Sequence, residues 1–524
     1  MVTFRRRSTF LPVFALAAIC TLYILRRSPH EDVDTPLQYI PTNEVPLEQE
    51  FENEILPTTT ERERLRVQAP PPPPPPPKNE APPFCRDTEC GTGRWRARSP
   101  AFSSPTELQK AYANKYDHVW QRCQVPSAER LPEAERNELE TRRLVDILNW
   151  EWVPAGGKLL MDFDALEFTI RMLKSPGGMI LMGDSISRQW HVTLTWKLRQ
   201  AGIIPEIDAP HLPHHDVPNF VQFTIHPNTP VRQYLLRQAG VPESRLQRPF
   251  LTMIENHLSI SHADIRRLTD TPPDFAWDHP HPQVDAWHEY VKELVTPVEG
   301  EEASVTEDSV LVMNTGAHWS RGVLYMLRKW TDEEVEMQKL HELYRAMMQL
   351  HIDRLGPLNR LTIFFRSTAP GHPSCEQRLA PYADGADARE KEKNIPERMM
   401  AVTDDEAMKA TRRRWDWDQF AVHNEFWREE IKKLMEGRTQ QLPRREEEIA
   451  VAEEGALESR AATPSRDSGA KWYYLDIYEL SLQRPDAHDS PGLDCLHWCM
   501  PAVLDEWSRL LYHQLNMIEH GSES

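Results

Sequence analysis

Residues 178–199, GMILMGDSISRQWHVTLTWKLR, have the pattern of a buried strand, a tight turn and a helix. Met179–Met182 is an unbroken apolar run, which is typical of a strand buried on both faces. Gly183-Asp184-Ser185 ends that run. From there the apolar residues recur every four positions, as on one face of a helix: Ile186, Trp190, Leu194 and Leu198. Ser185 is therefore expected on the turn at the carboxyl end of a strand.

A serine on such a turn suits a nucleophile. The first N–H groups of the following helix lack intrahelical acceptors, so they are placed to donate to an oxyanion when Ser185 attacks an acyl group. The alternative interpretation is structural. Asp and Ser are preferred helix N-caps, so Gly183-Asp184-Ser185 also fits the plain start of a helix.

Three later apolar runs repeat the strand pattern, and each leads into a polar segment. They are Val310–Met313, Leu361–Phe365 and Trp472–Ile477. Helical patterns lie between them, at 324–355 and 405–436. This alternation predicts a doubly wound α/β fold, with a site beyond the carboxyl ends of the strands.

The last polar segment contains Asp494 and His497, which are close enough for the carboxylate to hold one imidazole nitrogen while the other faces a serine. The spacing by itself is not specific, because it recurs at Asp208/His211, Asp278/His281 and Asp285/His288. The pair Asp494/His497 differs from these three because Cys495 and Cys499 bracket His497. Disulfides at these cysteines would fix the loop, as a catalytic pair requires. An amphipathic helix is expected to follow.

Composition limits the classes of function. The chain has 524 residues, enough for one large domain with extensions or for two or three smaller ones. Its formal net charge is -19, and no concentrated basic stripe is interleaved with aromatic residues. A nucleic-acid partner is therefore not expected.

The N-terminus predicts a membrane anchor. An apolar run at 9–25 lies between Arg5-Arg6-Arg7 and Arg26-Arg27, and it approaches the length of a membrane-spanning helix. The residues directly before Arg26, Tyr23-Ile24-Leu25, do not form a small-x-small cleavage pattern, so we expect an uncleaved signal anchor rather than a cleaved signal peptide. Residues 1–8 would then form a cytosolic tail, with the bulk of the chain in the lumen.

A stem and one folded domain are expected after the anchor. Residues 26–83 are rich in proline and acidic residues, which predicts an extended, disordered spacer. The luminal domain is expected at 84–520. Segments near 205–290, 380–412 and 437–470 are predicted insertions, and the last, charged and poor in aromatic residues, is predicted to be disordered.

The cysteines predict disulfides. Six of the seven lie beyond the anchor: Cys85, Cys90, Cys123, Cys375, Cys495 and Cys499. Six cysteines in a luminal chain can pair fully, and they leave 15 connectivities open. A zinc site is the rival interpretation, but we consider it less favoured because the cysteines do not form two close pairs at finger-like spacing.

A second metal candidate is the cluster His211, His214, His215 and Asp216. Histidines in a Pro-rich segment are more often plain loop residues. We therefore expect no metal centre.

Four ordered motifs make the chain similar to a known family. They are Gly183-Asp184-Ser185 with Ser187-Arg188, Asn314-Thr315-Gly316-Ala317-His318-Trp319, Phe365-Arg366-Ser367-Thr368-Ala369-Pro370-Gly371-His372 and Asp494-Cys495-Leu496-His497-Trp498-Cys499. Over about residues 85–517 the chain resembles the trichome birefringence-like and Cas1-related group of the PC-esterase superfamily. Two further stretches look like family positions, Trp150-Glu151-Trp152 and Arg484-Pro485-Asp486-Ala487-His488. The family's compact cysteine-rich segment is reduced here to Cys85, Cys90 and Cys123.

The resemblance implies an SGNH-hydrolase-like, three-layer α/β/α fold with a mostly parallel central sheet, behind a membrane anchor and stem. It also implies a single-pass type II protein of the Golgi membrane that transfers acetyl groups to a polysaccharide or oligosaccharide. Ser185 would be the nucleophile, His497 the general base and Asp494 its orienting carboxylate. No bound cofactor is expected, since acetyl-CoA or another acyl carrier would serve as co-substrate.

Further residues are assigned more loosely. Asn314, Arg188 and Gly183 are candidates for contacts to the oxyanion or the substrate, although an asparagine after a strand is often only a turn residue. The histidines of the other motifs are expected to be structural: His318, His372 and His488.

Two alternative functions stay open. An esterase that removes acetyl groups from a glycan would use the same three residues, with water in place of the sugar hydroxyl. A non-catalytic carbohydrate-binding or scaffold protein is the other alternative, and the joint presence of Ser185, Asp494 and His497 argues against it.

Overall fold

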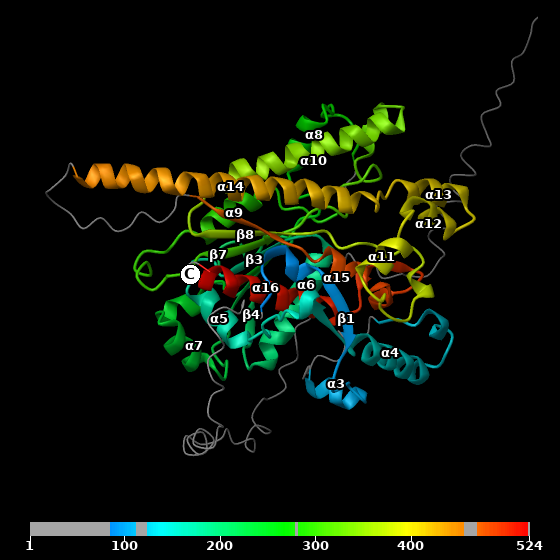
Figure 1. Cartoon of the computed structure of the whole chain (residues 1–524), viewed down its shortest axis with the longest axis horizontal. Helices are drawn as coiled ribbons and strands as arrows, with labels where there is room; N and C mark the ends of the chain where they lie inside the picture. The colour runs from blue at the N-terminus through cyan, green and yellow to red at the C-terminus, as the bar shows by residue number, and fades with distance from the viewer. Residues whose placement is uncertain (1–83, 112–122, 278–280, 455–468, 522–524) are drawn as a thin grey trace, which may run out of the picture. The chain divides into compact units, whose positions relative to one another are not determined.

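The computed structural model describes residues 84–111, 123–277, 281–454 and 469–521 (Figure 1). The predicted tail, signal anchor and stem, 1–83, lie outside these residues. Within the described ranges, no helix is both long enough and apolar enough to cross a membrane.

A central sheet organises the fold. Five of its strands pair in parallel, in the order β6, β3, β7, β8, β9, and two antiparallel strands extend it beyond β6. From edge to edge the strands are β4 (Pro205–Ile207), β5 (Phe220–Ile225), β6 (Leu251–Glu255), β3 (Met179–Gly183), β7 (Ser309–Met313), β8 (Leu361–Arg366) and β9 (Lys471–Leu475). The prediction of an α/β fold with a mostly parallel sheet is confirmed. The four apolar runs quoted above become β3, β7, β8 and β9.

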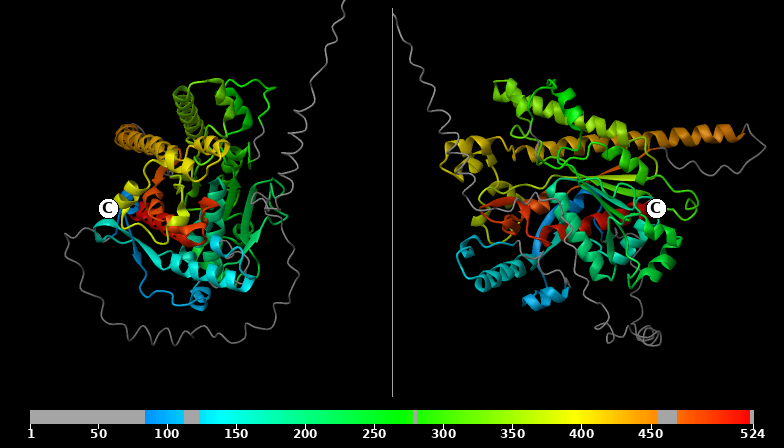
Figure 2. Two further views of the ribbon diagram at one scale, coloured as in Figure 1. Left: turned by 90° about the vertical axis from the view of Figure 1, so that its right-hand side faces the viewer. Right: turned by 180° about the vertical axis from the view of Figure 1, so that it is seen from behind.

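Both faces of the sheet are covered, which explains why β3 is apolar throughout. Met179 and Leu181 belong to one hydrophobic core, and Ile180 and Met182 belong to the other, because successive side chains of a strand point to opposite faces. Helices α5 (Ala165–Leu173), α6 (Ser185–Gln200), α7 (Arg232–Ala239) and α16 (Ala502–Gly521) contribute to the first core. Helices α8 (His262–Leu268), α9 (Trp287–Leu294), α10 (Glu333–Leu355) and α14 (Gln419–Glu454) contribute to the second (Figures 1 and 2). This arrangement fits the SGNH-like fold that the resemblance implies.

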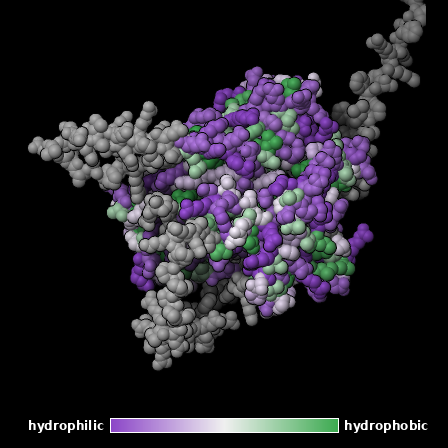
Figure 3. Space-filling model, in the orientation of Figure 1, coloured by the Kyte–Doolittle hydropathy of each residue, from purple (hydrophilic) through white to green (hydrophobic). Residues whose placement is uncertain are grey.

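Smaller elements surround these layers. Two antiparallel hairpins pair β1 (Gly93–Ala97) with β2 (Trp150–Pro154) and β10 (His488–Ser490) with β11 (Asp494–Trp498). The other α-helices are α3 (Pro105–Ala111), α4 (Glu133–Leu148), α11 (Gly385–Lys391), α12 (Ile395–Ala401), α13 (Glu406–Arg413) and α15 (Tyr478–Leu482). Short 3-10 helices are η1 (Asp87–Gly91), η3 (Pro126–Ala128), η4 (Ala155–Gly157), η5 (Glu243–Gln247), η6 (Tyr325–Lys329), η7 (Cys375–Gln377) and η8 (Pro485–Ala487). The face drawn in Figure 3 is mostly hydrophilic, in agreement with the net charge of -19.

Two segments predicted as insertions contain regular secondary structure. The segment 205–290 supplies β4, β5 and β6, and β6 is the neighbour of β3. Its strands are short and lie among prolines and histidines, which hid them. The segment 437–470 is not disordered throughout, because residues up to Glu454 continue α14, whereas 455–468 lie outside the described residues. Glu, Arg and Ala dominate that end of α14, and they are strong helix formers.

The six cysteines of the described residues all form disulfides. The pairs are Cys85–Cys90, Cys123–Cys499 and Cys375–Cys495. Cys495 and Cys499, which bracket His497, therefore bond to two different distant segments rather than to each other. The strand β11, predicted as a loop, is fixed covalently on both sides of the histidine.

The disulfide Cys375–Cys495 should stabilise the fold more than Cys85–Cys90. Its two cysteines are 120 positions apart in the sequence, whereas Cys85 and Cys90 are 5 apart. A disulfide that closes a longer loop removes more conformational entropy from the unfolded chain. We expect the double variant Cys375→Ser/Cys495→Ser to lower the free energy of unfolding by up to about 5 kcal/mol, and Cys85→Ser/Cys90→Ser by about 2 kcal/mol. Urea denaturation without reductant measures both. Equal losses would contradict the argument.

Candidate active site

Ser185 is the first residue of α6 and directly follows the turn at the end of β3. The N-cap is its neighbour Asp184, whose Oδ1 accepts hydrogen bonds from the N–H groups of Ile186 and Ser187 at 3.1 and 3.3 Å. The capping interpretation and the nucleophile interpretation thus apply to different residues. Asp184 caps the helix, and this leaves the Ser185 hydroxyl for another partner.

Gly183 is required by close packing under this turn. A Cβ atom at Gly183 would lie 2.3 Å from Ser187 Oγ and 3.0 Å from the carbonyl oxygen of Asn314. The Gly183 carbonyl also accepts a hydrogen bond from Asn256 N at 2.7 Å. The described contacts of Gly183 are therefore structural, and they hold the turn against the ends of the neighbouring strands.

The three residues expected to form a triad lie in line. Ser185 Oγ is 2.7 Å from His497 Nε2, and His497 Nδ1 is 2.7 Å from Asp494 Oδ2. The other oxygen of Asp494 accepts hydrogen bonds from the N–H groups of Leu496 and His497, both at 3.0 Å. Because the carboxylate can only accept, it holds the proton of the imidazole on Nδ1 and leaves Nε2 to accept from the serine.

The charges of the pair favour this arrangement. Burial lowers the pKa of His497, but the carboxylate of Asp494 outweighs it, so the pKa of His497 lies above its usual value. Burial also raises the pKa of Asp494, but attraction to His497 and the hydrogen bonds it accepts bring that pKa well below its usual range. The pair therefore stabilises a proton on the imidazole, which is what a general base needs when it deprotonates a serine.

Two side chains hold β11 in place: Gln189, which sequence reasoning missed, and His488, which it expected to be structural. Gln189 pairs with the backbone of Trp498 through two hydrogen bonds of 3.0 Å, donating from Nε2 to the carbonyl and accepting at Oε1 from the N–H. His488 Nδ1 donates to the carbonyl of His497 at 2.9 Å. Gln189 lies one helical turn beyond Ser185, on the same face of α6, and this spacing is the signal that could have found it.

A buried arginine supports the start of α6. Arg366, at the end of β8, donates to Ser187 Oγ at 3.1 Å, and its guanidinium lies 4.0 Å from Asp184 Oδ1 and over the ring of Trp507. Burial lowers the pKa of Arg366 to about 10, and Asp184 opposes that shift. Arg366 belongs to the third sequence motif, so its position was quoted there without a role.

Asn314 and Arg188 are engaged within the protein. Asn314 Nδ2 donates to the carbonyl of Arg366 at 2.8 Å and to Thr368 Oγ1 at 3.1 Å. Both hydrogens of the amide are thus used, which does not agree with a role in donating to an oxyanion. Arg188 Nε lies 3.6 Å from Glu255 Oε2, so Arg188 joins α6 to the end of β6.

The histidines of the other motifs fall into two groups. His372 and His488 are buried against each other, with Nδ1 of the first 2.6 Å from Nε2 of the second, as expected for structural residues. His318 lies instead against His257 and His281.

The predicted cluster of His211, His214, His215 and Asp216 is not assembled as a metal site. Its histidines contact three different partners: His211 the carbonyl of Gln247, His214 the carboxylate of Glu293, and His215 the carbonyl of Leu212.

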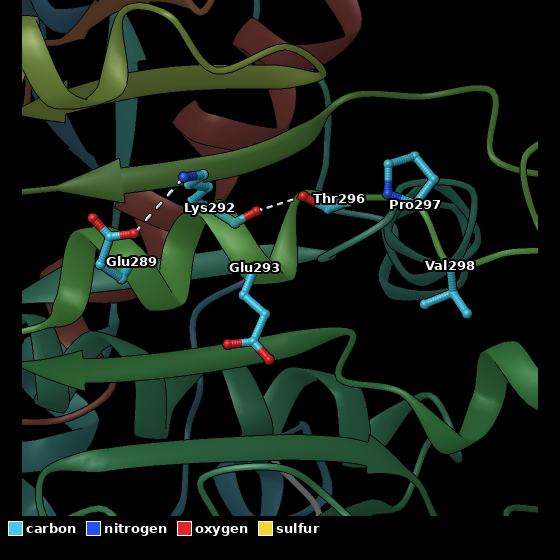
Figure 4. A pocket seen from close by; sticks show the side chains of 6 residues that line it. All are labelled: Glu289, Lys292, Glu293, Thr296, Pro297 and Val298. Atoms are coloured by element: carbon cyan, nitrogen blue, oxygen red, sulfur yellow. Dashed lines mark hydrogen bonds and ion pairs between the residues drawn. The ribbon is translucent and has the colours of Figure 1, made fainter.

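A surface pocket lies away from this chemistry. It has a volume of about 450 Å³ and is lined by Glu289, Lys292, Glu293, Thr296, Pro297 and Val298, at the carboxyl end of α9 (Figure 4). None of the triad residues lines it. Lys292 forms an ion pair with Glu289, Thr296 donates to the Lys292 carbonyl, and Glu293 contacts His214. We assign the pocket no function.

Comparison with known proteins gives a family match over part of the chain. Residues 293–514 match the family described as PC-Esterase, a GDSL/SGNH-like acyl-esterase family found in Pmr5 and Cas1p. The match includes Asp494 and His497, and it begins after Ser185.

Curated relatives match over short segments. The chain is 50% identical to protein trichome birefringence-like 38 of Arabidopsis thaliana over 48 residues, which are 8% of this chain and 13% of the relative. It is 33% identical to xyloglucan O-acetyltransferase 2 of Populus trichocarpa over 63 residues, 9% of this chain and 15% of the relative. These matches thus span well under two thirds of either relative. Across residues 293–514 the chain is similar to the PC-esterase family, and three of its four motifs lie within that range.

Proposed function

We propose that this protein is an O-acyltransferase that moves an acetyl group to a polysaccharide hydroxyl through an acyl-serine formed on Ser185. The observation that carries the proposal is the unbroken chain of hydrogen bonds from Ser185 through His497 to Asp494. The PC-esterase match and the relatives named xyloglucan O-acetyltransferase support acyl chemistry on a polysaccharide.

The first half-reaction loads the serine. Ser185 Oγ attacks the acyl carbon of the donor while its proton passes to His497 Nε2, and Asp494 stabilises the imidazolium that forms. Collapse of the tetrahedral intermediate breaks the bond to the donor's leaving group, which takes the proton from His497. The products are acetyl-Ser185 and the free carrier.

The second half-reaction delivers the acetyl group. A sugar hydroxyl gives its proton to His497 Nε2 and attacks the acetyl carbon, and His497 then returns the proton to Ser185 Oγ as the serine leaves. In both steps the oxyanion lies near the start of α6. Asp184 already accepts from the N–H groups of Ile186 and Ser187, so the N–H of Ser185 is the natural donor. The chemistry needs no bound cofactor, only acetyl-CoA or another acyl carrier as donor.

We place the protein in the Golgi membrane as a single-pass type II protein with its catalytic domain in the lumen. The apolar run at 9–25 supports the anchor. The three disulfides support an oxidising compartment, because such bonds persist in secretory lumens and are rare in the cytosol.

The central test compares the Ser185→Ala variant with the unsubstituted protein, both as full-length chains, in an acetyl-transfer assay. Purified protein is incubated with radiolabelled acetyl-CoA or p-nitrophenyl acetate and a panel of oligosaccharides that includes xyloglucan fragments. We expect label on a glycan, reduced on the order of 10³-fold or more by Ser185→Ala, because the covalent intermediate cannot form. Ser304→Ala, a matched change whose hydroxyl bonds only to the backbone at Glu301, should keep full activity.

The same assay separates the alternatives. An esterase would release acetate from a pre-acetylated glycan in a Ser185-dependent manner and would label no acceptor. A binding or scaffold protein would retain glycans in a pull-down with neither activity. Either result would contradict the transferase proposal.

The pH profile tests the role of His497. The base acts only when neutral, so kcat/KM should rise with pH through a pKa above the usual 6.5 of histidine. Asp494→Asn removes the carboxylate that raises this pKa. In this variant the acidic limb of the kcat/KM profile should therefore shift to lower pH. The plateau value of kcat/KM should fall by roughly 10³–10⁴-fold, because the imidazole is no longer held in the required tautomer. Asp216→Asn, at an exposed position, is the control, and an acidic limb unmoved in Asp494→Asn would refute the assignment.

Gln189 is expected to act as a positioning residue. Gln189→Ala removes both hydrogen bonds to Trp498, so His497 should lose alignment and kcat should fall by roughly 10- to 100-fold, with KM within about twofold. Gln189→Glu keeps the acceptor for the Trp498 N–H and should recover part of the loss. Gln200→Ala, exposed at the end of the same helix, serves as control. Equal effects on kcat and on thermal stability in Gln189→Ala and Gln200→Ala would rule out a positioning role.

A further inference from the structure

Three histidines from separate loops meet at the carboxyl edge of the sheet. His257 follows the end of β6, His281 lies between α8 and α9, and His318 lies in the segment after β7. One nitrogen from each ring lies within 4.8 Å of the others. Since β6 and β7 both pair with β3, the loops of His257 and His318 flank the strand that leads to Ser185.

The loops that carry these rings are tied together. His257 N donates to the carbonyl of Pro282 at 3.2 Å, next to His281. Thr315 Oγ1 donates to the carbonyl of His257 at 3.2 Å, and Trp319 Nε1 donates to the carbonyl of Leu258 at 3.1 Å. The rings are thus held by their backbones rather than gathered by chance, as a metal site requires.

One ring is oriented as metal ligands are. His257 Nε2 lies 3.2 Å from Glu255 Oε1, so it donates to that carboxylate and leaves the lone pair on Nδ1. His257 is only 1% exposed, and Nδ1 is buried without a hydrogen-bond partner. A buried imidazole nitrogen opposite a carboxylate-bound one is the usual arrangement of a metal-bound histidine. Arg188, paired with Glu255, fixes the carboxylate in turn.

We propose that His257, His281 and His318 bind a divalent transition-metal ion, with Zn²⁺ as the best match. Three neutral imidazoles suit Zn²⁺ and its neighbours, whereas Mg²⁺ and Ca²⁺ prefer oxygen ligands. His257 is buried and His281 and His318 are half-buried, so the cluster lies near the surface. The proposal is independent of acyl transfer, and it replaces the expectation that the chain has no metal centre.

Packing alone is the competing explanation. The rings of His257 and His318 are stacked, with centroids 4.1 Å apart and planes 27° from parallel. The centroid of the His281 ring is 5.1 Å from that of His257 and 4.4 Å from that of His318. A stacked cluster without metal affinity would show the same distances, so the two explanations differ in binding and not in geometry.

Metal titration of the purified full-length chain tests the proposal. The protein, freed of any affinity tag and of metal by a chelator, is titrated with Co²⁺ and then with Zn²⁺. We expect one equivalent of tight binding, ligand-field absorption typical of four-coordinate Co²⁺, and its loss when Zn²⁺ is added. A chain that binds no stoichiometric equivalent would overturn the proposal.

Variants locate the site. The double variant His281→Ala/His318→Ala should no longer bind one equivalent of metal. It should still fold, because both side chains are half-exposed, and far-UV circular dichroism checks the fold. His211→Ala/His215→Ala, two exposed histidines of the other candidate cluster, should keep it. Glu255→Gln should weaken binding about 10- to 100-fold, because the carboxylate orients His257. Binding that survives in His281→Ala/His318→Ala, or disappears in His211→Ala/His215→Ala, would refute this location.

Discussion

The hydrogen bond between Ser185 and His497 is the constraint on which the rest of the structure depends. It joins two residues 312 positions apart, one at the start of a helix and one on a small hairpin. A contact of 2.7 Å tolerates little relative motion, so both supports must be rigid. The first support is part of the central sheet. The second, β10–β11, has no hydrogen-bonded neighbour in that sheet and must be held by other means.

Two kinds of interaction hold the hairpin. The disulfides of Cys495 and Cys499 lead to two separate segments, so β11 is restrained on each side of His497. Gln189 ties the backbone beyond His497 to the same helix that carries Ser185. Covalent links limit how far the hairpin can open, and the side-chain amide sets its register against α6. The alignment of Ser185 and His497 thus follows from fixed backbones rather than from the side chains alone.

The carboxyl edge of the sheet gathers the polar chemistry of the molecule. In a doubly wound sheet the parallel strands end at one edge, so loops far apart in sequence meet there. The ends of β3, β6 and β7 bring Ser185, Glu255 and Asn314 to this edge, and Arg188 links the helix after β3 to the loop after β6. The hydrogen-bonded site of Ser185 and the histidine cluster therefore both follow from one topology, although their residues differ.

The sequence by itself determined the strand and helix that carry Ser185, because strands buried on both faces must be apolar throughout and β3 meets that requirement in four consecutive residues. It did not determine β11, which carries Asp494 and His497 and was expected to be a loop. It also indicated Ser185, His497 and Asp494, which stand in ordered motifs. Only the tertiary structure decided that β6, from a segment that looked like an insertion, is the neighbour of β3, which cysteines pair, and that the amide of Asn314 is engaged within the protein. The local sequence pattern depends on the burial and backbone conformation of each element. Contacts between residues distant in sequence depend on how all the elements pack together.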